Sequence, residues 1–272
     1  MKIIRQKKDL LNFINRVKNI SFVPTMGGLH KGHLELIKKA KKKSEFVIVS
    51  IFINPKQFNS KRDFATYPRT IKKDIELLKK LKVNCLYNPN DNDIFNFKTK
   101  KKVYMHPFSQ KLCGKFRPGH FEGVVNVINR FLEIIKPKYI FLGKKDFQQL
   151  ILIKNHILKR KIKTIVIQCD TVRFKKYLPF SSRNMNLTNY EKNFAIKVFK
   201  TIKSEKIKIK NKKLNKINLS DLKKRIKSIG VKKIEYIEAV NLVNLKKAKK
   251  YNENFNIFSA IYVNKIRLID NF

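Results

Sequence analysis

The sequence predicts an α/β protein with a doubly wound parallel sheet, followed by a smaller second domain. Two observations carry this prediction. Short apolar segments with strand character alternate with segments whose apolar residues recur every three or four positions, from about residue 20 to residue 169. From about residue 173 the pattern changes, and a helical segment is followed by consecutive strand-like segments. We therefore expect domains at residues 1–172 and 173–272.

The first elements are a strand, a glycine turn and a helix. Residues 20–23 are mostly apolar and compatible with a strand, and we expect Pro24 to end the regular pairing. Gly27 and Gly28 allow backbone N–H groups to approach an anion closely. The following helix has an apolar stripe over residues 34–40. A helix start behind such a turn favours a phosphate site, since its unpaired N–H groups and its positive dipole end attract negative charge.

The next segments continue the alternation. Residues 46–53 form a continuous apolar segment, which is typical of a parallel strand covered on both faces. Ligands of such a sheet bind beyond the carboxyl ends of its strands. Further strands are expected at residues 85–87, 139–142 and 164–169, and helices at residues 70–81, 124–135 and from residue 146 onward.

The second domain is predicted to contain a small antiparallel sheet. A helix over residues 220–229 is expected to end at Gly230. Strands are expected at residues 234–240, 255–263 and 266–269.

Length and composition indicate a globular protein. The 272 residues are 43% hydrophobic, which is enough for one large or two modest cores. No segment approaches the ~20 apolar residues of a membrane span, and the N-terminus lacks an uninterrupted signal-peptide core. Cys85, Cys113 and Cys169 are scattered and form no zinc-binding pair. We therefore expect a cytoplasmic protein with no membrane partner.

The formal net charge of +45 arises from 64 Lys and Arg residues against 19 Asp and Glu. Such a charge attracts nucleic-acid backbones, but the lysines are spread over almost every helix and loop and form no single module. Lys, Asn, Ile and Phe are abundant, whereas Trp is absent and Gly numbers only 8, as A- and T-rich codons would produce. We interpret the charge as a by-product of base composition and expect no specific nucleic-acid partner.

Polar side chains follow three of the predicted strands. His30 and His33 follow the first, Gln57 follows the second, and Lys145 and Gln149 follow a later one. We expect them to converge on one crevice, where lysine suits a phosphate and neutral amides suit a substrate with a hydroxyl and a carboxylate. The His-x-Gly-His order behind a glycine turn resembles the signature of the adenylyl-transferring superfamily that includes class I aminoacyl-tRNA synthetases.

Six motifs occur along the chain, at residues 23–33, 51–58, 67–70, 117–124, 143–150 and 181–184. In their order and spacing they resemble the pantothenate synthetase family over nearly the whole chain. The resemblance implies ATP-dependent condensation of pantoate with β-alanine through a pantoyl adenylate, with release of pyrophosphate and AMP. It also implies a Rossmann-like first domain that binds nucleotide and pantoate, a C-terminal α+β lid domain, and a homodimer formed by the first domain.

The resemblance further implies roles for individual residues. His30, His33 and Lys145 would be catalytic, because they would face the phosphates where negative charge builds up. Mg²⁺ would bridge phosphate oxygens, with no protein ligand assigned. The implied ATP-binding residues are Met26, His30, His33, Gly143, Lys145, Asp146, Ser181, Ser182 and Arg183, and the implied pantoate-binding residues are Asn54, Gln57, Tyr67 and Gln149.

The chain departs from the family pattern before Ser181, where residues 173–180 have lost the usual turn glycine. Lys31 and Lys144 add positive charge beside the expected phosphates. Two alternatives remain open at this point. Another small-molecule adenylyltransferase would share the His-x-Gly-His segment without requiring Gln57, and a basic RNA-binding protein would use the net charge alone.

Overall fold

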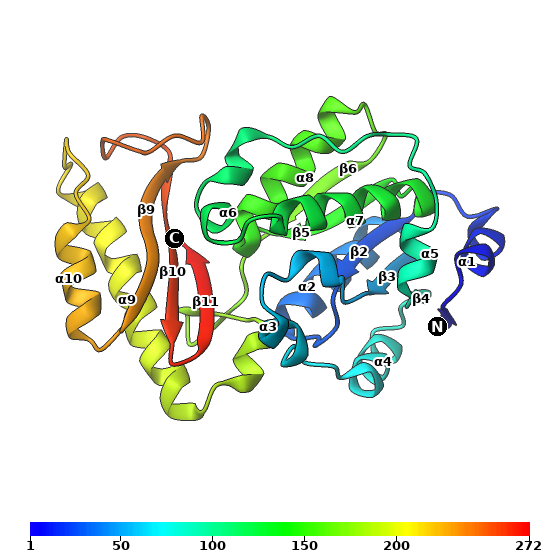
Figure 1. Cartoon of the computed structure of the whole chain (residues 1–272), viewed down its shortest axis with the longest axis horizontal. Coiled ribbons are helices and arrows are strands. Elements are labelled where there is room, and N and C mark those ends of the chain that lie inside the picture. Colours follow the sequence, from blue (N-terminus) through cyan, green and yellow to red (C-terminus); the bar gives the residue numbers. More distant parts are fainter. The chain divides into compact units, whose positions relative to one another are not determined.

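The computed structural model describes all 272 residues and divides into two compact units, Met1–Val172 and Arg173–Phe272 (Figure 1). The first unit contains a six-stranded sheet in which every pairing is parallel. Its strands are β1 (Lys2–Ile4), β2 (Ser21–Thr25), β3 (Val47–Ile51), β4 (Cys85–Tyr87), β5 (Tyr139–Gly143) and β6 (Ile165–Cys169). Their order in the sheet is β1-β4-β3-β2-β5-β6.

The strand order reverses beside β2. From β2 the chain proceeds to β3 and β4 on one side, and later to β5 and β6 on the other. A ligand of such a sheet binds outside the carboxyl ends of the strands at this switch point. The carboxyl end of β2 is Thr25 and that of β5 is Gly143. The segments that carry His30 and Lys145 therefore leave the sheet at the switch point.

Helices cover both faces of this sheet. They are α1 (Lys7–Ile14), α2 (Lys31–Lys43), α3 (Lys61–Ala65), α4 (Ile71–Lys80), α5 (Asp91–Phe95), α6 (Cys113–Phe116), α7 (His120–Ile135) and α8 (Phe147–Lys159), with 3₁₀ turns η1 (Pro55–Gln57), η2 (Pro107–Gln110) and η3 (Lys144–Asp146). Phe22, Ile48 and Ile140 pack with α7 and α8, whereas the neighbouring Val23 and Val49 pack with α2 and α4. Successive strand residues thus point to opposite faces, and the predicted doubly wound fold is confirmed.

The second unit packs two helices against a three-stranded antiparallel sheet ordered β11-β10-β9. Its elements are a hairpin of β7 (Arg173–Phe174) and β8 (Leu178–Pro179), η4 (Ser182–Asn186), α9 (Asn189–Asn211), α10 (Ser220–Ser228), β9 (Lys233–Asn241), β10 (Phe255–Val263) and β11 (Ile266–Asn271). The three strands and α10 match the predicted segments. Helix α9 has no predicted counterpart, although Thr188 and Glu191 begin it with a capping box.

Two predicted boundaries are wrong. Pro24 lies inside β2, in register with Ser50 of β3. The pairing of β2 with β5 stops at Phe22, so no ladder bond to β5 requires the N–H that proline lacks. Helix α7 begins at His120 and not at residue 124, because Gly119 adopts a left-handed backbone (φ +76°) and starts the helix there.

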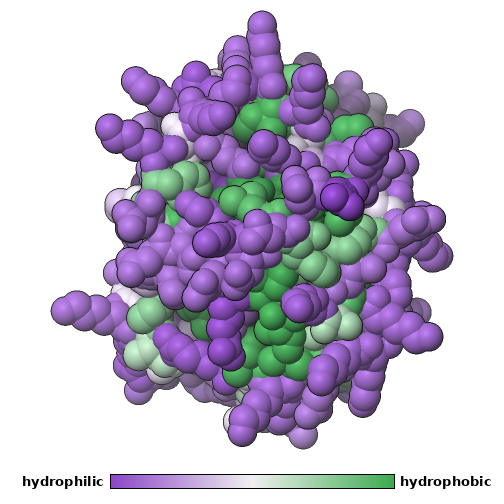
Figure 2. Space-filling view, turned by 90° about the vertical axis from the view of Figure 1, so that its right-hand side faces the viewer, coloured by the Kyte–Doolittle hydropathy of each residue, from purple (hydrophilic) through white to green (hydrophobic).

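The surface is mostly hydrophilic. Figure 2 shows one face on which hydrophilic side chains surround an apolar band. In the N-terminal segment Met1, Ile3, Leu11 and Phe13 are each 36–43% exposed. None of the helices combines the length and the apolar character that crossing a membrane would require.

Candidate active site

The glycine turn behind β2 is held by a buried carboxylate. Gly27 and Gly28 have left-handed φ angles of +76° and +60°. The N–H groups of Gly28 and Leu29 donate to the two carboxylate oxygens of Asp74 on α4, at 2.9 Å and 2.8 Å. We expected these N–H groups to approach a ligand anion. The anion they contact is the protein's own Asp74, so these two N–H groups are already engaged, and nearby side chains are the candidates for contact with a phosphate.

Those side chains begin with the two histidines at the start of α2. His30 is the N-cap residue, and its Nδ1 accepts a hydrogen bond from the N–H of Gly32 (3.1 Å). The ring hydrogen of a neutral His30 therefore resides on Nε2. His33 lies in the first turn, and its ring stacks on that of His30 with 4.0 Å between centroids. The Nδ1 atom of His33 is buried without a hydrogen-bond partner, which is consistent with a site completed by a ligand.

Both imidazoles are neutral at pH 7. Burial lowers the pKa of His33 from 6.5 to about 4, assisted by Lys145 and opposed by Asp146. Burial also lowers the pKa of His30 to about 2, with further contributions from His33 and Lys145. The two rings therefore offer N–H donors without charge, and the ammonium group of Lys145 supplies the positive charge among these three side chains.

Lys145 and Asp146 lie on η3, directly behind β5. The Lys145 side chain is only 18% exposed, and its Nζ lies 3.3 Å from Asp146 Oδ1. The preceding Gly143 has no atom within 4 Å of the position that a Cβ would occupy. Open space thus adjoins the chain where β5 ends. Lys144 points elsewhere, since its Nζ pairs with the exposed Asp170 at 2.7 Å.

A second group of side chains follows β3. Gln57 on η1 is 7% exposed, and its Nε2 contacts the sulfur of Met26. This contact joins the chain behind β3 to the turn behind β2. Asn54 is 1% exposed; its Nδ2 donates to the carbonyl oxygen of Gly123 (3.0 Å) and its Oδ1 accepts from the N–H of Lys56 (3.1 Å). Asn54 therefore fixes η1 and stands behind Gln57.

The motif at residues 117–124 clamps the backbone of Gln57. Arg117 donates to the carbonyl oxygen of Gln57 at 3.1 Å, and His120 Nδ1 lies 2.7 Å from the same oxygen. Arg117 also lies 3.1 Å from His120 Nε2. Because a carbonyl only accepts and a guanidinium only donates, His120 is neutral with its hydrogen on Nδ1. At Gly123 an added Cβ would lie 2.4 Å from the carbonyl oxygen of Lys56, so only glycine allows this approach.

Two neighbouring glutamines on α8 have different surroundings. Gln148 is buried, donates to the carbonyl oxygens of Phe108 and Lys111 (both 2.6 Å) and accepts from the N–H of Cys113 (3.1 Å). It anchors the first turn of α8. Gln149 is half-buried on the same turn.

Tyr67 is 7% exposed, and its ring packs edge-on against Phe58 at 5.5 Å. This contact places Tyr67 beside the segment that follows Gln57.

The remaining predicted residues belong to the second unit. Ser181 is the N-cap of η4, where its Oγ accepts from the N–H of Arg183 (3.4 Å), and Ser182 is buried. In the hairpin before them, Lys175 and Lys176 adopt left-handed φ angles of +44° and +65°. The turn that lost its glycine is therefore formed by two lysines in a backbone region that glycine prefers.

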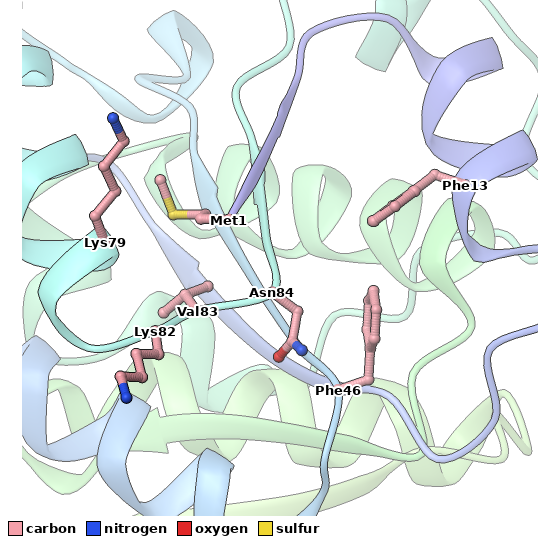
Figure 3. Close-up of a pocket in the computed structure, with 7 residues that line it drawn as sticks. All are labelled: Met1, Phe13, Phe46, Lys79, Lys82, Val83 and Asn84. Carbon is pink, nitrogen blue, oxygen red and sulfur yellow. The ribbon is translucent and has the colours of Figure 1, made fainter.

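A separate open hollow of about 400 Å³ lies elsewhere on the first unit. Phe13 and Phe46 line one side of it and Lys79 and Lys82 the other (Figure 3). Phe46 directly precedes β3, so the hollow adjoins the amino ends of the strands, away from the switch point. None of the predicted site residues lines it.

Sequence reasoning missed four residues that shape the site: Asp74, Arg117, His120 and Gly123. For the last three the available signal was the Arg-Pro-Gly-His-Phe-Glu-Gly-Val run, which identifies a family but does not state what its side chains contact. For Asp74 the only signal was an acidic residue in the first turn of a predicted helix, which is common.

Comparison with known proteins identifies the family to which this chain belongs. A family model described as pantoate-beta-alanine ligase matches residues 2–272. A pantothenate synthetase of Francisella tularensis subsp. mediasiatica (strain FSC147) is 40% identical over 272 residues, which cover 99% of this chain and 95% of that protein. The crystal structure of a Francisella tularensis pantoate-beta-alanine ligase, complexed with beta-gamma ATP and beta-alanine, matches with a TM-score of 0.84 and 39% identity, covering 100% of this chain and 97% of that one. A pantothenate synthetase structure from Thermus thermophilus matches with a TM-score of 0.91 and 26% identity, covering 100% and 99%. The chain therefore belongs to the pantoate-beta-alanine ligase family.

Proposed function

We propose that this protein condenses pantoate with β-alanine, using ATP, through a pantoyl-adenylate intermediate. The observation that carries the proposal is that side chains suited to phosphates and a side chain suited to a hydroxy acid follow neighbouring strands at the same edge of the sheet. Behind β2 and β5 lie a neutral histidine pair and a lysine that suit phosphates, and behind β3 lies a buried amide, Gln57, that suits a hydroxy acid.

In the first step, a pantoate carboxylate oxygen attacks the α-phosphorus of ATP. The bond from the α-phosphorus to the bridging oxygen breaks, and pyrophosphate leaves with the electron pair. His30 and His33 donate N–H groups to the phosphate oxygens, and Lys145 stabilises the charge that develops on the departing group. Met26, Gly143 and Asp146 border the nucleotide, with Gly143 admitting it closely because no atom fills the position of a Cβ.

Pantoate binding is assigned to the chain behind β3 and to α8. Gln57 and Gln149 bind its hydroxyl and carboxylate groups, and Tyr67 borders the substrate. Asn54 contributes by holding η1, since its own amide is engaged by the backbone of Gly123 and Lys56. We expect the site to discriminate strongly between pantoate and an analogue without a hydroxyl, because the analogue would leave the buried amides without a hydrogen-bond partner.

In the second step, the amine of β-alanine attacks the acyl carbon of the adenylate and AMP departs with the bond electrons. Alignment and exclusion of water account for most of this rate, because free adenylate hydrolyses. By family resemblance, Ser181, Ser182 and Arg183 bind the triphosphate, and the second unit serves as a lid.

Mg²⁺ is proposed as the ion that accompanies ATP. The chain contains no group of three or more His, Cys, Asp or Glu side chains suited to hold a metal. We propose that phosphate oxygens and water would supply most of the ligands of this ion, as is usual for magnesium. When bound, the ion neutralises part of the charge on the phosphates.

The direct test is ATP-dependent AMP release by the purified protein, with pantoate and β-alanine omitted in turn. We expect AMP and pantothenate in equal amounts only with all three substrates, and pantoyl adenylate when β-alanine alone is omitted. AMP release with a different carboxylic acid, but not with pantoate, would instead support another adenylyltransferase. Absence of ATP turnover, together with tight RNA binding at physiological salt, would support the RNA-binding alternative.

We also propose a homodimer formed by the first unit. The exposed apolar side chains Met1, Ile3, Leu11 and Phe13 support a protein contact on this unit. Sedimentation equilibrium over a range of concentrations is expected to give twice the chain mass of 32.2 kDa. A monomer at all concentrations would contradict this assembly.

A further inference from the structure

We infer that Asp74 is a positioning residue for adenylate formation, acting on His30 and His33 through the backbone of the glycine turn. The inference rests on the proposed function. Asp74 lies in the first turn of α4 and is 1% exposed. It contacts the turn across 45 and 46 positions of sequence, through the N–H groups of Leu29 and Gly28.

The carboxylate of Asp74 is fully engaged within the protein. Oδ2 accepts from Gly28 N–H at 2.9 Å, and Oδ1 accepts from Leu29 N–H at 2.8 Å. The hydroxyl of Thr70 lies 3.2 Å from both oxygens. The start of α4 contributes the positive end of a helix dipole. A buried carboxylate with these donors holds the turn in one geometry, because every departure leaves a buried charge or N–H group without a partner.

The turn fits tightly around this carboxylate. A Cβ at Gly27 would lie 3.1 Å from Asp74 Oδ2 and 3.2 Å from Ile51 Cγ2. The left-handed φ of Gly27 independently disfavours any side chain there. Asp74 and the end of β3 thus confine the turn from two sides.

The same turn determines where the histidines lie. Leu29, which donates to Asp74, is followed directly by His30, the N-cap of α2. His30 in turn holds Gly32 through its Nδ1 and stacks on His33. Asp74 therefore fixes the residue before the N-cap, and the N-cap fixes both rings. A shift of about 1 Å at a reacting group costs on the order of 10²-fold in rate, so a small movement of the turn is sufficient to slow the reaction.

The test compares Asp74→Asn with a matched variant elsewhere. Asn has the size of Asp but replaces one acceptor oxygen by an NH₂ group, which cannot accept from the turn. The control is Asn129→Ala on α7, which removes buried bonds to Lys101 and His156 away from the turn. Both variants are expected to unfold at lower urea. Thr70→Val, which only removes the hydroxyl donor to Asp74, serves as a milder second variant.

We expect Asp74→Asn to form pantoyl adenylate at least about tenfold more slowly than wild type in rapid-quench experiments. Pantoate affinity and the rate at which β-alanine consumes a preformed adenylate should change less than about twofold. Thr70→Val should slow the same step by a smaller factor, and Asn129→Ala should change neither rate once the folded fraction is taken into account. The ring NMR signals of His30 and His33 should shift in Asp74→Asn and Thr70→Val but not in Asn129→Ala.

If folded Asp74→Asn and folded Thr70→Val both form adenylate at the wild-type rate, the inference is overturned. Equal slowing of adenylate formation and of the attack by β-alanine would also overturn it. If the wild-type protein proves inactive with pantoate and β-alanine, the proposed function fails. The inference is then decided by the NMR signals of His30 and His33 and by ATP affinity. Unchanged histidine signals in both Asp74→Asn and Thr70→Val would overturn it. Should Asp74→Asn fail to fold, Thr70→Val carries the same comparison.

Discussion

The rings of His30 and His33 stack with 4.0 Å between their centroids and 27° between their planes. Two protonated imidazoles at this distance would repel each other, and the ammonium of Lys145 would add to that repulsion. The arrangement is therefore stable only while the rings are neutral. The two rings thus present N–H donors without charge, and the positive charge beside them is that of Lys145.

This relationship predicts how stability depends on pH. In the folded protein the pKa is lowered to about 2 for His30 and about 4 for His33, from an ordinary 6.5. As the pH falls below 6.5, the unfolded chain takes up protons first, so the stability present above pH 6.5 is lost progressively, toward pH 4 for His33 and further toward pH 2 for His30. Urea midpoints of wild type and His33→Asn between pH 7.5 and 4.5 measure this. The variant should lose less stability over that range, and parallel curves would contradict the assignment.

His33→Ala and Lys145→Ala should slow adenylate formation much more than the attack by β-alanine. Loss of one preorganised donor to a charged transition state typically costs about 10²–10³ in rate. The pyrophosphate has already left when the amine attacks, so the second step should be nearly unaffected. Lys144→Ala is the matched control, because Lys144 pairs with the exposed Asp170. Variants that form adenylate normally and stall at the amine step would reverse the assignment.

Gln57→Ala and Gln149→Ala should weaken pantoate binding more than ATP binding. A hydrogen bond lost in a desolvated site costs ~1–3 kcal/mol, which corresponds to about tenfold or more in affinity. Gln148→Ala is the matched control, since the described hydrogen bonds of Gln148 are all to backbone groups of the protein. It should lower the urea midpoint and leave the pantoate affinity of the folded protein unchanged. Separate titrations of each ligand measure this, and equal losses for ATP and pantoate would refute the role of Gln57 and Gln149.

His120→Ala should raise the KM for pantoate several-fold with little change in that for ATP. His120 holds the backbone carbonyl of Gln57 together with Arg117. His120→Asn should recover part of the loss, because the amide NH₂ replaces the Nδ1 donor. Steady-state kinetics with each substrate varied would reveal this. If Asn and Ala behave alike, the hydrogen bond to Gln57 does not support pantoate binding.

Lys176→Gly should stabilise the second unit. The left-handed φ of Lys176, +65°, costs a side-chain-bearing residue about 1–2 kcal/mol relative to the right-handed region, whereas glycine adopts it freely. The added entropy of a glycine in the unfolded chain offsets part of this gain. Urea unfolding should show a higher midpoint for the variant. The control is Lys265→Gly, at an exposed turn position without a left-handed φ, and it should unfold at a slightly lower urea midpoint. A lower midpoint for Lys176→Gly as well would show that the left-handed backbone of Lys176 is not strained.

Local sequence patterns predicted most of the strands. The strand at residues 46–53 and the helix at residues 70–81 are close to β3 and α4, because continuous apolar segments and regular apolar spacing are local properties. Helix α9 was not predicted. Its buried residues, which include Ala195, Phe199 and Ile202, are separated by many lysines, and its position is secured by packing within the second unit.

The sequence by itself determined the fold class, the family and the presence of the two histidines and Lys145 behind strand ends. Only the tertiary structure decided what surrounds them. The bond from Leu29 to Asp74 joins residues 45 positions apart, and that from Arg117 to Gln57 joins residues 60 apart. No local periodicity encodes such pairs. The neutrality of His30 and His33 likewise follows from desolvation and from the nearby charge of Lys145, and both depend on how the folded chain excludes water.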